Sequence, residues 1–243
     1  MRPVALLTDF QKSEYVGVMK GVLLREAPGA PVVDLFHGVT PQAVREGAWV
    51  LSVTYSNFPH GTVFLAVVDP GVGGSRRGVA VWTQHYAFVG PDNGLLYPSA
   101  MSDGLVRAVA LEVPAEASST FHGRDVFAPA AAAIACDRSI AGPEITDLVP
   151  LEFHLDQREG EVVRIDPFGN IITNLPPVAG RATYRMRLER LSAELPWVPT
   201  YSAAPEGELV VVTGSAGTLE IAMKNKSAET KLAPELGQRV VLE

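Results

Sequence analysis

The N-terminal part of the chain alternates between short apolar runs and longer segments whose apolar residues recur every three or four positions. Short apolar runs bounded by turn residues predict buried strands, and the longer spacing predicts helices packed on one face. The second helix is predicted to begin at Thr40, a residue type that favours N-caps, with Pro41 in its first turn. The predicted order is strand, helix, strand, helix, strand, over residues 3–10, 13–29, 30–39, 40–59 and 61–74.

Aspartates stand at the ends of two of these predicted strands. Strands that alternate with helices form a parallel layered sheet, and the ligands of such sheets bind at the carboxyl ends of the strands. Asp9 follows the first apolar run, and Asp69 follows the third. We therefore expect both carboxylates at the same edge of one sheet.

The pattern changes near the polar, charged segment HLDQREGE at residues 154–161. Short β-rich runs follow, separated by turn residues, and few helix signals remain. This spacing is typical of a smaller all-β domain, either a barrel or a sandwich. We expect an α/β protein with an N-terminal α/β layered domain on a mostly parallel sheet in residues 1–153. The all-β domain is expected in residues 160–243.

Composition narrows the class of protein. The chain has 243 residues, of which 47% are hydrophobic, and a formal net charge of −7. Without a Lys/Arg cluster an acidic chain binds nucleic acid poorly, because phosphate neutralisation supplies most of that affinity. The single cysteine, Cys136, cannot form an internal disulfide. No apolar stretch reaches the ~20 residues that span a bilayer, and Asp9 interrupts the N-terminal run, so we expect a soluble, cytoplasmic protein.

The glycine-rich segment VVDPGVGGSRRGVAV follows the third predicted strand. It lacks the Gly-Lys-Ser/Thr of a P-loop, and Arg76 stands where the last glycine of G-x-G-x-x-G would be. Two interpretations remain. The segment is a tight turn that ends in surface arginines, or its glycines let backbone N–H groups and Arg76 approach a small anion or polar ligand. No H-E-x-x-H, Cys/His cluster or G-x-S-x-G elbow occurs, which disfavours a metal enzyme and an α/β-hydrolase.

The segment TFHGRDVFAPAAAA at residues 120–133 also allows two interpretations. In the first, Asp125 caps the alanine-rich helix and pairs with Arg124, and His122 is a hydrogen-bonded, semi-buried residue. In the second, His122 takes part in chemistry. Two later segments, IDPFGNIITNL and TGSAGTLEIA, could likewise be simple turns between strands.

Six segments in this order nevertheless resemble one family. LLTDF…YVGVMKGVL, VVDPGVGGSRRGVAV, FVGPDNGLL, TFHGRDVFAPAAA, IDPFGNIITNL and GSAGTLEIA are similar to segments of the S-adenosyl-L-methionine (SAM) hydroxide adenosyltransferase family, which is related to the fluorinases and chlorinases. The resemblance implies an N-terminal α/β domain, a C-terminal β-barrel and a homotrimer whose sites lie between subunits. It also implies hydrolysis of SAM to adenosine and L-methionine by attack of water or hydroxide at the ribose C5′, without a cofactor or metal.

The resemblance assigns catalytic and substrate-binding residues. The Asp, Arg and His of the family's proposed triad correspond to Asp69, Arg76 and His122, which would activate and orient the water. The expected substrate-binding residues are Asp9, Gln42, Asp166, Phe168, Asn170, Ser215 and Glu220. Among these, Gln42 stands where the halogenases have an aromatic residue.

The expected contacts of these residues cover the whole substrate. The Asp9 carboxylate would accept hydrogen bonds from both hydroxyls of the ribose diol. Asp166 would face the methionine ammonium, Phe168 and Asn170 would meet the adenine, and Ser215 would bind the methionine carboxylate.

Two other functions remain open. A halogenase would use chloride or fluoride as the nucleophile, but a carboxylate such as Asp69 beside a halide site would repel the anion. Halide-using relatives also lack the Asp and His found here at Asp69 and His122. The second alternative is a non-catalytic sensor that binds SAM or adenosine without turnover.

Overall fold

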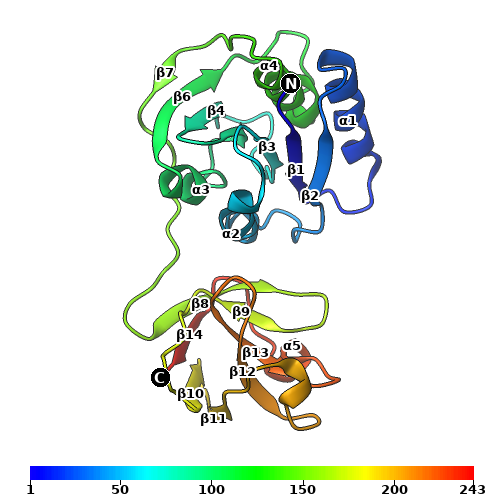
Figure 1. Cartoon of the computed structure of the whole chain (residues 1–243). Helices are drawn as coiled ribbons and strands as arrows, with labels where there is room; N and C mark the ends of the chain where they lie inside the picture. The colour runs from blue at the N-terminus through cyan, green and yellow to red at the C-terminus, as the bar shows by residue number, and fades with distance from the viewer. The chain divides into compact units, whose positions relative to one another are not determined.

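The computed structural model describes all residues from Met1 to Glu243. The chain divides into two compact units, Met1–Leu151 and Glu152–Glu243, each built on its own seven-stranded sheet (Figure 1). None of the helices is both long and apolar enough to cross a membrane.

The first unit contains a mixed, mostly parallel sheet, as predicted. Strands β2, β1, β3 and β5 are neighbours and run parallel, β4 is antiparallel to both β5 and β6, and β7 is antiparallel to β6. In spatial order the strands are β2 (Val32–Phe36), β1 (Val4–Thr8), β3 (Val63–Val67), β5 (Ala87–Pro91), β4 (Gly78–Thr83), β6 (Leu105–Leu111) and β7 (Glu144–Ile145).

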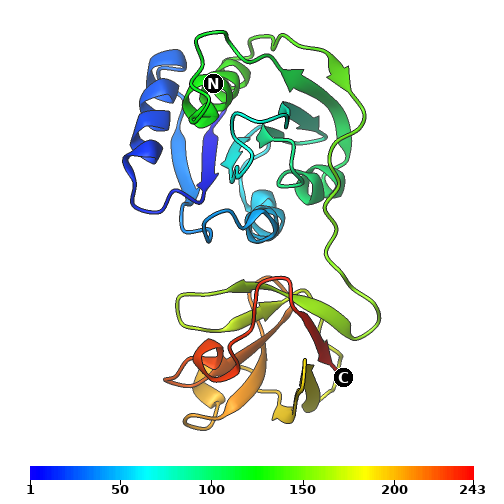
Figure 2. The same ribbon diagram turned by 180° about the vertical axis from the view of Figure 1, so that it is seen from behind.

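Helices cover both faces of this sheet. On one face, α1 (Glu14–Glu26) contacts α4 (Ala128–Ala135), and the two lie side by side in both views (Figures 1 and 2). On the other face, α2 (Val44–Thr54) contacts α3 (Tyr97–Ser102). A Cβ on Gly47 of α2 would lie 2.8 Å from Leu95 Cδ1 and 3.0 Å from Val68 Cγ2, so glycine permits the close approach of α2 to the sheet.

The predicted start of the second helix at Thr40 is wrong. The helix begins at Val44, because Gln42 has a left-handed backbone with φ of 66°. This conformation directs the Gln42 N–H to Asp9 Oδ2 at 2.8 Å. A long-range hydrogen bond therefore replaces the first helical turn.

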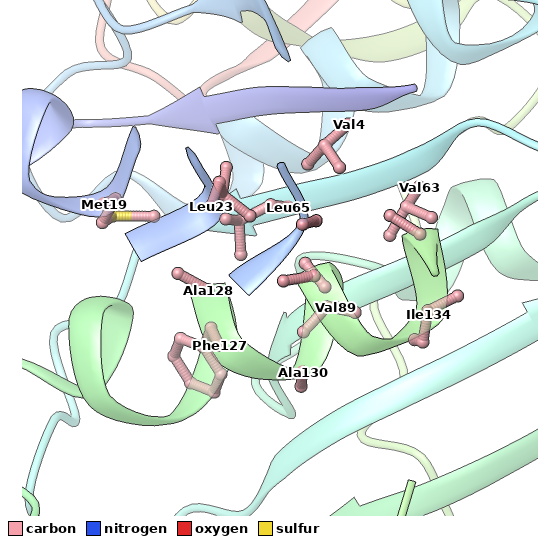
Figure 3. Close-up of a cluster of buried hydrophobic side chains, with 14 of the residues drawn as sticks. Val4, Met19, Leu23, Val63, Leu65, Val89, Phe127, Ala128, Ala130 and Ile134 are labelled. Carbon is pink, nitrogen blue, oxygen red and sulfur yellow. The ribbon is translucent and has the colours of Figure 1, made fainter. Parts of the chain in front are cut away.

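The core beneath α1 and α4 positions the loops that follow the strands. Figure 3 shows Met19 and Leu23 of α1 meeting Leu65 of β3, with Phe127 and Ala128 entering from the start of α4. All five side chains are fully buried, and burying each large apolar side chain contributes about 1.5–3 kcal/mol. The small alanines of α4 bring its axis near the sheet.

The second unit is an antiparallel, nearly closed, barrel-like sheet. In spatial order its strands are β11 (Leu191–Pro196), β10 (Thr183–Leu188), β14 (Arg239–Leu242), β8 (Glu159–Ile165), β9 (Ile171–Thr173), β13 (Leu219–Met223) and β12 (Leu209–Thr213). All neighbouring pairs are antiparallel. A bridge between Trp197 and Val211 joins the chain after β11 to β12, so the two edge strands meet. The barrel alternative of the sequence analysis is the one that the structure supports.

Shorter helical segments complete the fold. In the second unit, α5 (Ala228–Leu232) begins at Ser227, whose hydroxyl accepts the Thr230 N–H at 3.0 Å. The remaining segments are a 3₁₀ turn at Tyr55–Asn57, a π-helical turn at Gly123–Phe127 and a 3₁₀ turn at Tyr201–Ala203.

Candidate active site

One guanidinium joins the three residues expected to be catalytic. Arg76 donates from Nε to Asp69 Oδ1 at 2.9 Å, and from Nη2 to both Asp69 Oδ2 and His122 Nδ1, the latter at 2.9 Å. The Arg76 and Asp69 side chains are only 10% and 6% exposed. A forked contact in such a dry setting fixes the orientation of both partners. The remaining nitrogen, Nη1, is buried without a hydrogen-bond partner, the kind of unsatisfied group that calls for a functional explanation.

The loops that carry this triad touch where only glycine fits. Gly73 has φ of +74°, and a Cβ there would lie 2.1 Å from the carbonyl oxygen of Ser119. The loop after β3 therefore rests on the segment that leads to His122. Arg76 Cζ lies 5.2 Å from the ring centroid of Phe127, within cation–π range. The π-helical turn begins directly after His122, and such turns occur frequently at functional sites.

The contact with Arg76 fixes the protonation of His122. A guanidinium can only donate, so His122 Nδ1 must be the acceptor, and the proton of the neutral imidazole sits on Nε2. Burial, and then the charge of Arg76, lower the pKa of His122 below its ordinary value of 6.5. His122 is therefore a neutral N–H donor at neutral pH.

A cavity of about 410 Å³ lies at the carboxyl edge of the first unit's sheet. Asp9, Gln42, Asp69 and His122 line it together, so the structure brings four of the sequence-predicted residues to one space, with Arg76 bound to two of them. The Asp9 carboxylate accepts the Gln42 N–H and still has lone pairs for a ligand. The volume of this cavity is in the usual range of about 300–1,000 Å³ for small-molecule sites.

Three aromatic side chains that the sequence analysis did not assign to the site also line this cavity. Phe10, Tyr15 and Phe121 pack edge to face, with ring centroids 5.0–6.0 Å apart. They form an apolar wall beside the charged triad, which limits the access of bulk water.

The interpretation in which Asp125 caps the alanine-rich helix is wrong. Its carboxylate instead accepts the Ser118 N–H at 2.9 Å. The expected pairing with Arg124 is present, with Nε 2.6 Å from Oδ1. Asp125, paired with Arg124, therefore stabilises the loop around Ser118 that leads to His122.

Three predicted residues meet in the second unit. Asp166, Phe168 and Asn170 line a cavity of about 720 Å³. Asp166 Oδ1 accepts the backbone N–H groups of Phe168 and Asn170, each at 2.9 Å, and Oδ2 accepts the Asn170 amide at 2.8 Å. These hydrogen bonds hold the turn and leave Asn170 Oδ1 as an acceptor. Phe168 is 79% exposed.

Ser215 and Glu220 do not line that cavity. Ser215 lies exposed in the turn between β12 and β13, whereas Glu220 is buried on β13. Tyr201 and Lys224 do line the cavity. They were not predicted from the sequence, because they belong to no recognisable motif. No group of three or more metal-ligating side chains is assembled anywhere in the chain.

Comparison with known proteins shows the family to which this chain belongs. Sequence models of the SAM hydroxide adenosyltransferase N-terminal and C-terminal domains match residues 4–143 and 160–241. The chain belongs to the SAM hydroxide adenosyltransferase family, which confirms the resemblance seen in the sequence.

Named relatives narrow the comparison within that family. An (R)-S-adenosyl-L-methionine hydrolase of Thermus thermophilus is 42% identical across the full length of both chains. Another, of Salinispora arenicola, is 38% identical over 98% of this chain and 96% of that relative. The crystal structure of an uncharacterised conserved protein of Thermotoga maritima superposes with a TM-score of 0.91 at 34% identity, covering 99% of this chain and all of that one. A fluorinase of Actinoplanes is more distant, 28% identical over 90% of each chain.

Proposed function

We propose that this protein hydrolyses SAM to adenosine and L-methionine. The observation that carries the proposal is the buried Asp69–Arg76–His122 cluster, which meets a small-molecule cavity beside Asp9. The hydrolase names of the relatives at 42% and 38% identity support it.

The chemistry requires a positioned water more than an acid. The sulfonium of SAM is a good leaving group, so L-methionine leaves with the electron pair of the C5′–S bond and needs no proton. The water oxygen attacks C5′ from the side opposite to sulfur and loses one proton as the C5′–O bond forms. A dry, aligned site lowers this barrier.

The geometry supports a division of roles in the triad. His122 Nε2–H donates to the attacking oxygen and orients it. Asp69 accepts the proton that the water loses, because its carboxylate lines the cavity and keeps lone pairs beyond those used by Arg76. Arg76 holds both residues and stabilises the developing negative charge on oxygen.

The remaining residues bind the rest of the substrate. Asp9 takes the ribose diol, with Gln42 beside it. Phe168 stacks on the adenine, and Asn170 Oδ1 accepts from its exocyclic amine. Asp166 and Ser215 take the ammonium and carboxylate of the methionine end.

The two halves of the site are contributed by different subunits in this proposal. The N-terminal cavity of one subunit and the C-terminal cavity of the next would combine in a homotrimer. The exposed Phe168 ring supports such an arrangement, because large exposed aromatics mark binding surfaces. Sedimentation should give a trimer.

The origin of the oxygen tests the reaction directly. Turnover of SAM in ¹⁸O-labelled water should give adenosine that carries ¹⁸O at the 5′ position, because the nucleophile is water. Adenosine without label would contradict the proposed bond formation at C5′. Intact SAM that stays bound would favour the sensor alternative.

Turnover is expected to fall at acid pH as His122 takes up a proton. The pKa of His122 is lowered from its ordinary value of 6.5 by burial and by the charge of Arg76. The kcat should therefore stay constant from neutral pH to below 6.5 and decline only as the pH approaches this lowered pKa. A proton on Nδ1 would eliminate the acceptor for Arg76. The unfolded chain takes up this proton at higher pH than the folded protein, so the free energy of unfolding should also decrease below 6.5.

The kcat–pH profile at saturating SAM, compared with that of His122→Asn, checks this expectation. The variant should be slower and lack the acid limb that belongs to His122. An acid limb that is unchanged in the variant would show that another group titrates.

A further inference from the structure

Glu220 is a buried carboxylate on the outer face of the barrel-like sheet. Its neighbours on β13, Leu219 and Ile221, point into the barrel core. Ala222, two positions along on the same face as Glu220, packs instead with a separate apolar cluster that includes Ala204. The segment 198–204 therefore lies over this face, and Glu220 is only 5% exposed beneath it.

This carboxylate is bound to a residue of the cavity wall. The Tyr201 hydroxyl donates to Glu220 Oε2 at 2.5 Å, and Tyr201 lines the 720 Å³ cavity. Next to it, Ser202 also lines the cavity, and its carbonyl accepts from Lys224 at 3.0 Å. Segment 198–204 thus lines the cavity through Tyr201 and Ser202, and Glu220 binds Tyr201 from the side of the sheet.

The turn before β13 closes on the same carboxylate. A Cβ on Gly214 would lie 1.7 Å from Glu220 Oε1, so the Gly214–Gly217 turn, which carries Ser215, rests directly against Glu220. Among the charged groups that face Glu220, Asp166 repels its charge and Arg164 attracts it. Burial is the largest influence and raises the pKa of Glu220, whereas the hydrogen bond from Tyr201 and the charge of Arg164 partly oppose this rise. Glu220 does not line the cavity, so its contacts are with Tyr201 and this turn.

We propose that Glu220 is a positioning residue that holds Tyr201 in the wall of the nucleoside-binding cavity and supports the neighbouring turn that carries Ser215, without touching the substrate. The proposal rests on the proposed function, which puts adenosine in this cavity. It also replaces the expectation that Glu220 binds the substrate itself.

A double-mutant cycle on adenosine affinity tests this inference. Tyr201→Phe and Glu220→Gln should each weaken adenosine binding by roughly 10-fold or more, the effect of a hydrogen bond to a charged group. The double variant should be no weaker than the poorer single variant, because both changes act on the same hydrogen bond: phenylalanine removes the donor, and glutamine replaces the charged acceptor by a neutral one. kcat at saturating SAM should change far less than KM, since neither group meets the reacting atoms.

Glu194→Gln is the matched control, because it removes an exposed carboxylate from β11 of the same unit. It should bind adenosine like the unaltered protein. Calorimetry measures the affinities, and thermal melting verifies the fold. If Glu220→Gln does not fold, Tyr201→Phe alone still decides, because it keeps the carboxylate and the ring.

Two results would overturn the inference. One is multiplicative losses in the double variant, which would mean that Glu220 and Tyr201 act independently. The other is unaltered affinity in Tyr201→Phe. A protein that binds adenosine but leaves SAM intact would contradict the proposed function while the cycle still measures this coupling. A protein that binds no adenosine would contradict both.

Discussion

Replacing Arg76 by lysine is expected to lower kcat for adenosine formation by about 100-fold or more, comparable to the loss of a donor at a charge-stabilising site. The guanidinium contacts two carboxylate oxygens of Asp69 and one ring nitrogen of His122. A lysine ammonium keeps the charge but cannot reproduce this fork. Because Asp69 keeps a cationic neighbour, the variant avoids leaving a buried charge unpaired.

Arg77→Lys provides the matched control. Arg77 is the next residue along the chain and pairs with Asp92 and Asp147 instead of the triad. Steady-state kinetics on both variants should show a large loss of kcat only for Arg76→Lys, with KM for SAM little changed. Equal losses in the two variants would mean that Arg76 serves the fold and not the reaction.

Asp9→Ala is expected to weaken the binding of adenosine and SAM alike, by roughly 10- to 100-fold. Both ligands carry the ribose diol, and the Asp9 carboxylate lies at the cavity with capacity for two further hydrogen bonds. Loss of charge-assisted hydrogen bonds accounts for this magnitude.

A ligand variant isolates this contact. The unaltered protein should bind 2′-deoxyadenosine more weakly than adenosine, and Asp9→Ala should lose most of that preference. Calorimetric titration of both proteins with both nucleosides measures it. If Asp9→Ala still distinguished the two nucleosides as well as the unaltered protein does, the assignment of Asp9 to the diol would be wrong.

The alternation of apolar runs was sufficient to predict the first unit's layered sheet. Asp9 and Asp69 follow buried strands, and the parallel arrangement of β1 and β3 brings both residues to one cavity. The triad itself was assigned by family resemblance. Its guanidinium bridge, and thus the tautomer of His122, depends on a contact between residues 46 positions apart in the chain, which local patterns do not encode.

Hydrogen bonds to residues outside the predicted helices explain the wrong predictions. Thr40 and Pro41 carry a local helix-start signal, but the Gln42 N–H is bonded to Asp9 and the helix starts later. Likewise, aspartate is a residue type that favours helix N-caps, but Asp125 accepts a hydrogen bond from the Ser118 N–H instead. Tyr201 has no sequence signal of a site residue. It lies in a short turn, and its position depends on a hydrogen bond to Glu220, 19 positions along the chain.

The product of SAM turnover with and without chloride tests the central claim most directly. The purified protein is incubated with SAM in halide-free buffer and again with added chloride, and the products are separated by chromatography. We expect adenosine and L-methionine in equal amounts under both conditions, because the Asp69 carboxylate disfavours a halide at the nucleophile position. A 5′-chloro nucleoside that forms only with chloride would instead identify a halogenase and contradict the assignment of hydrolysis.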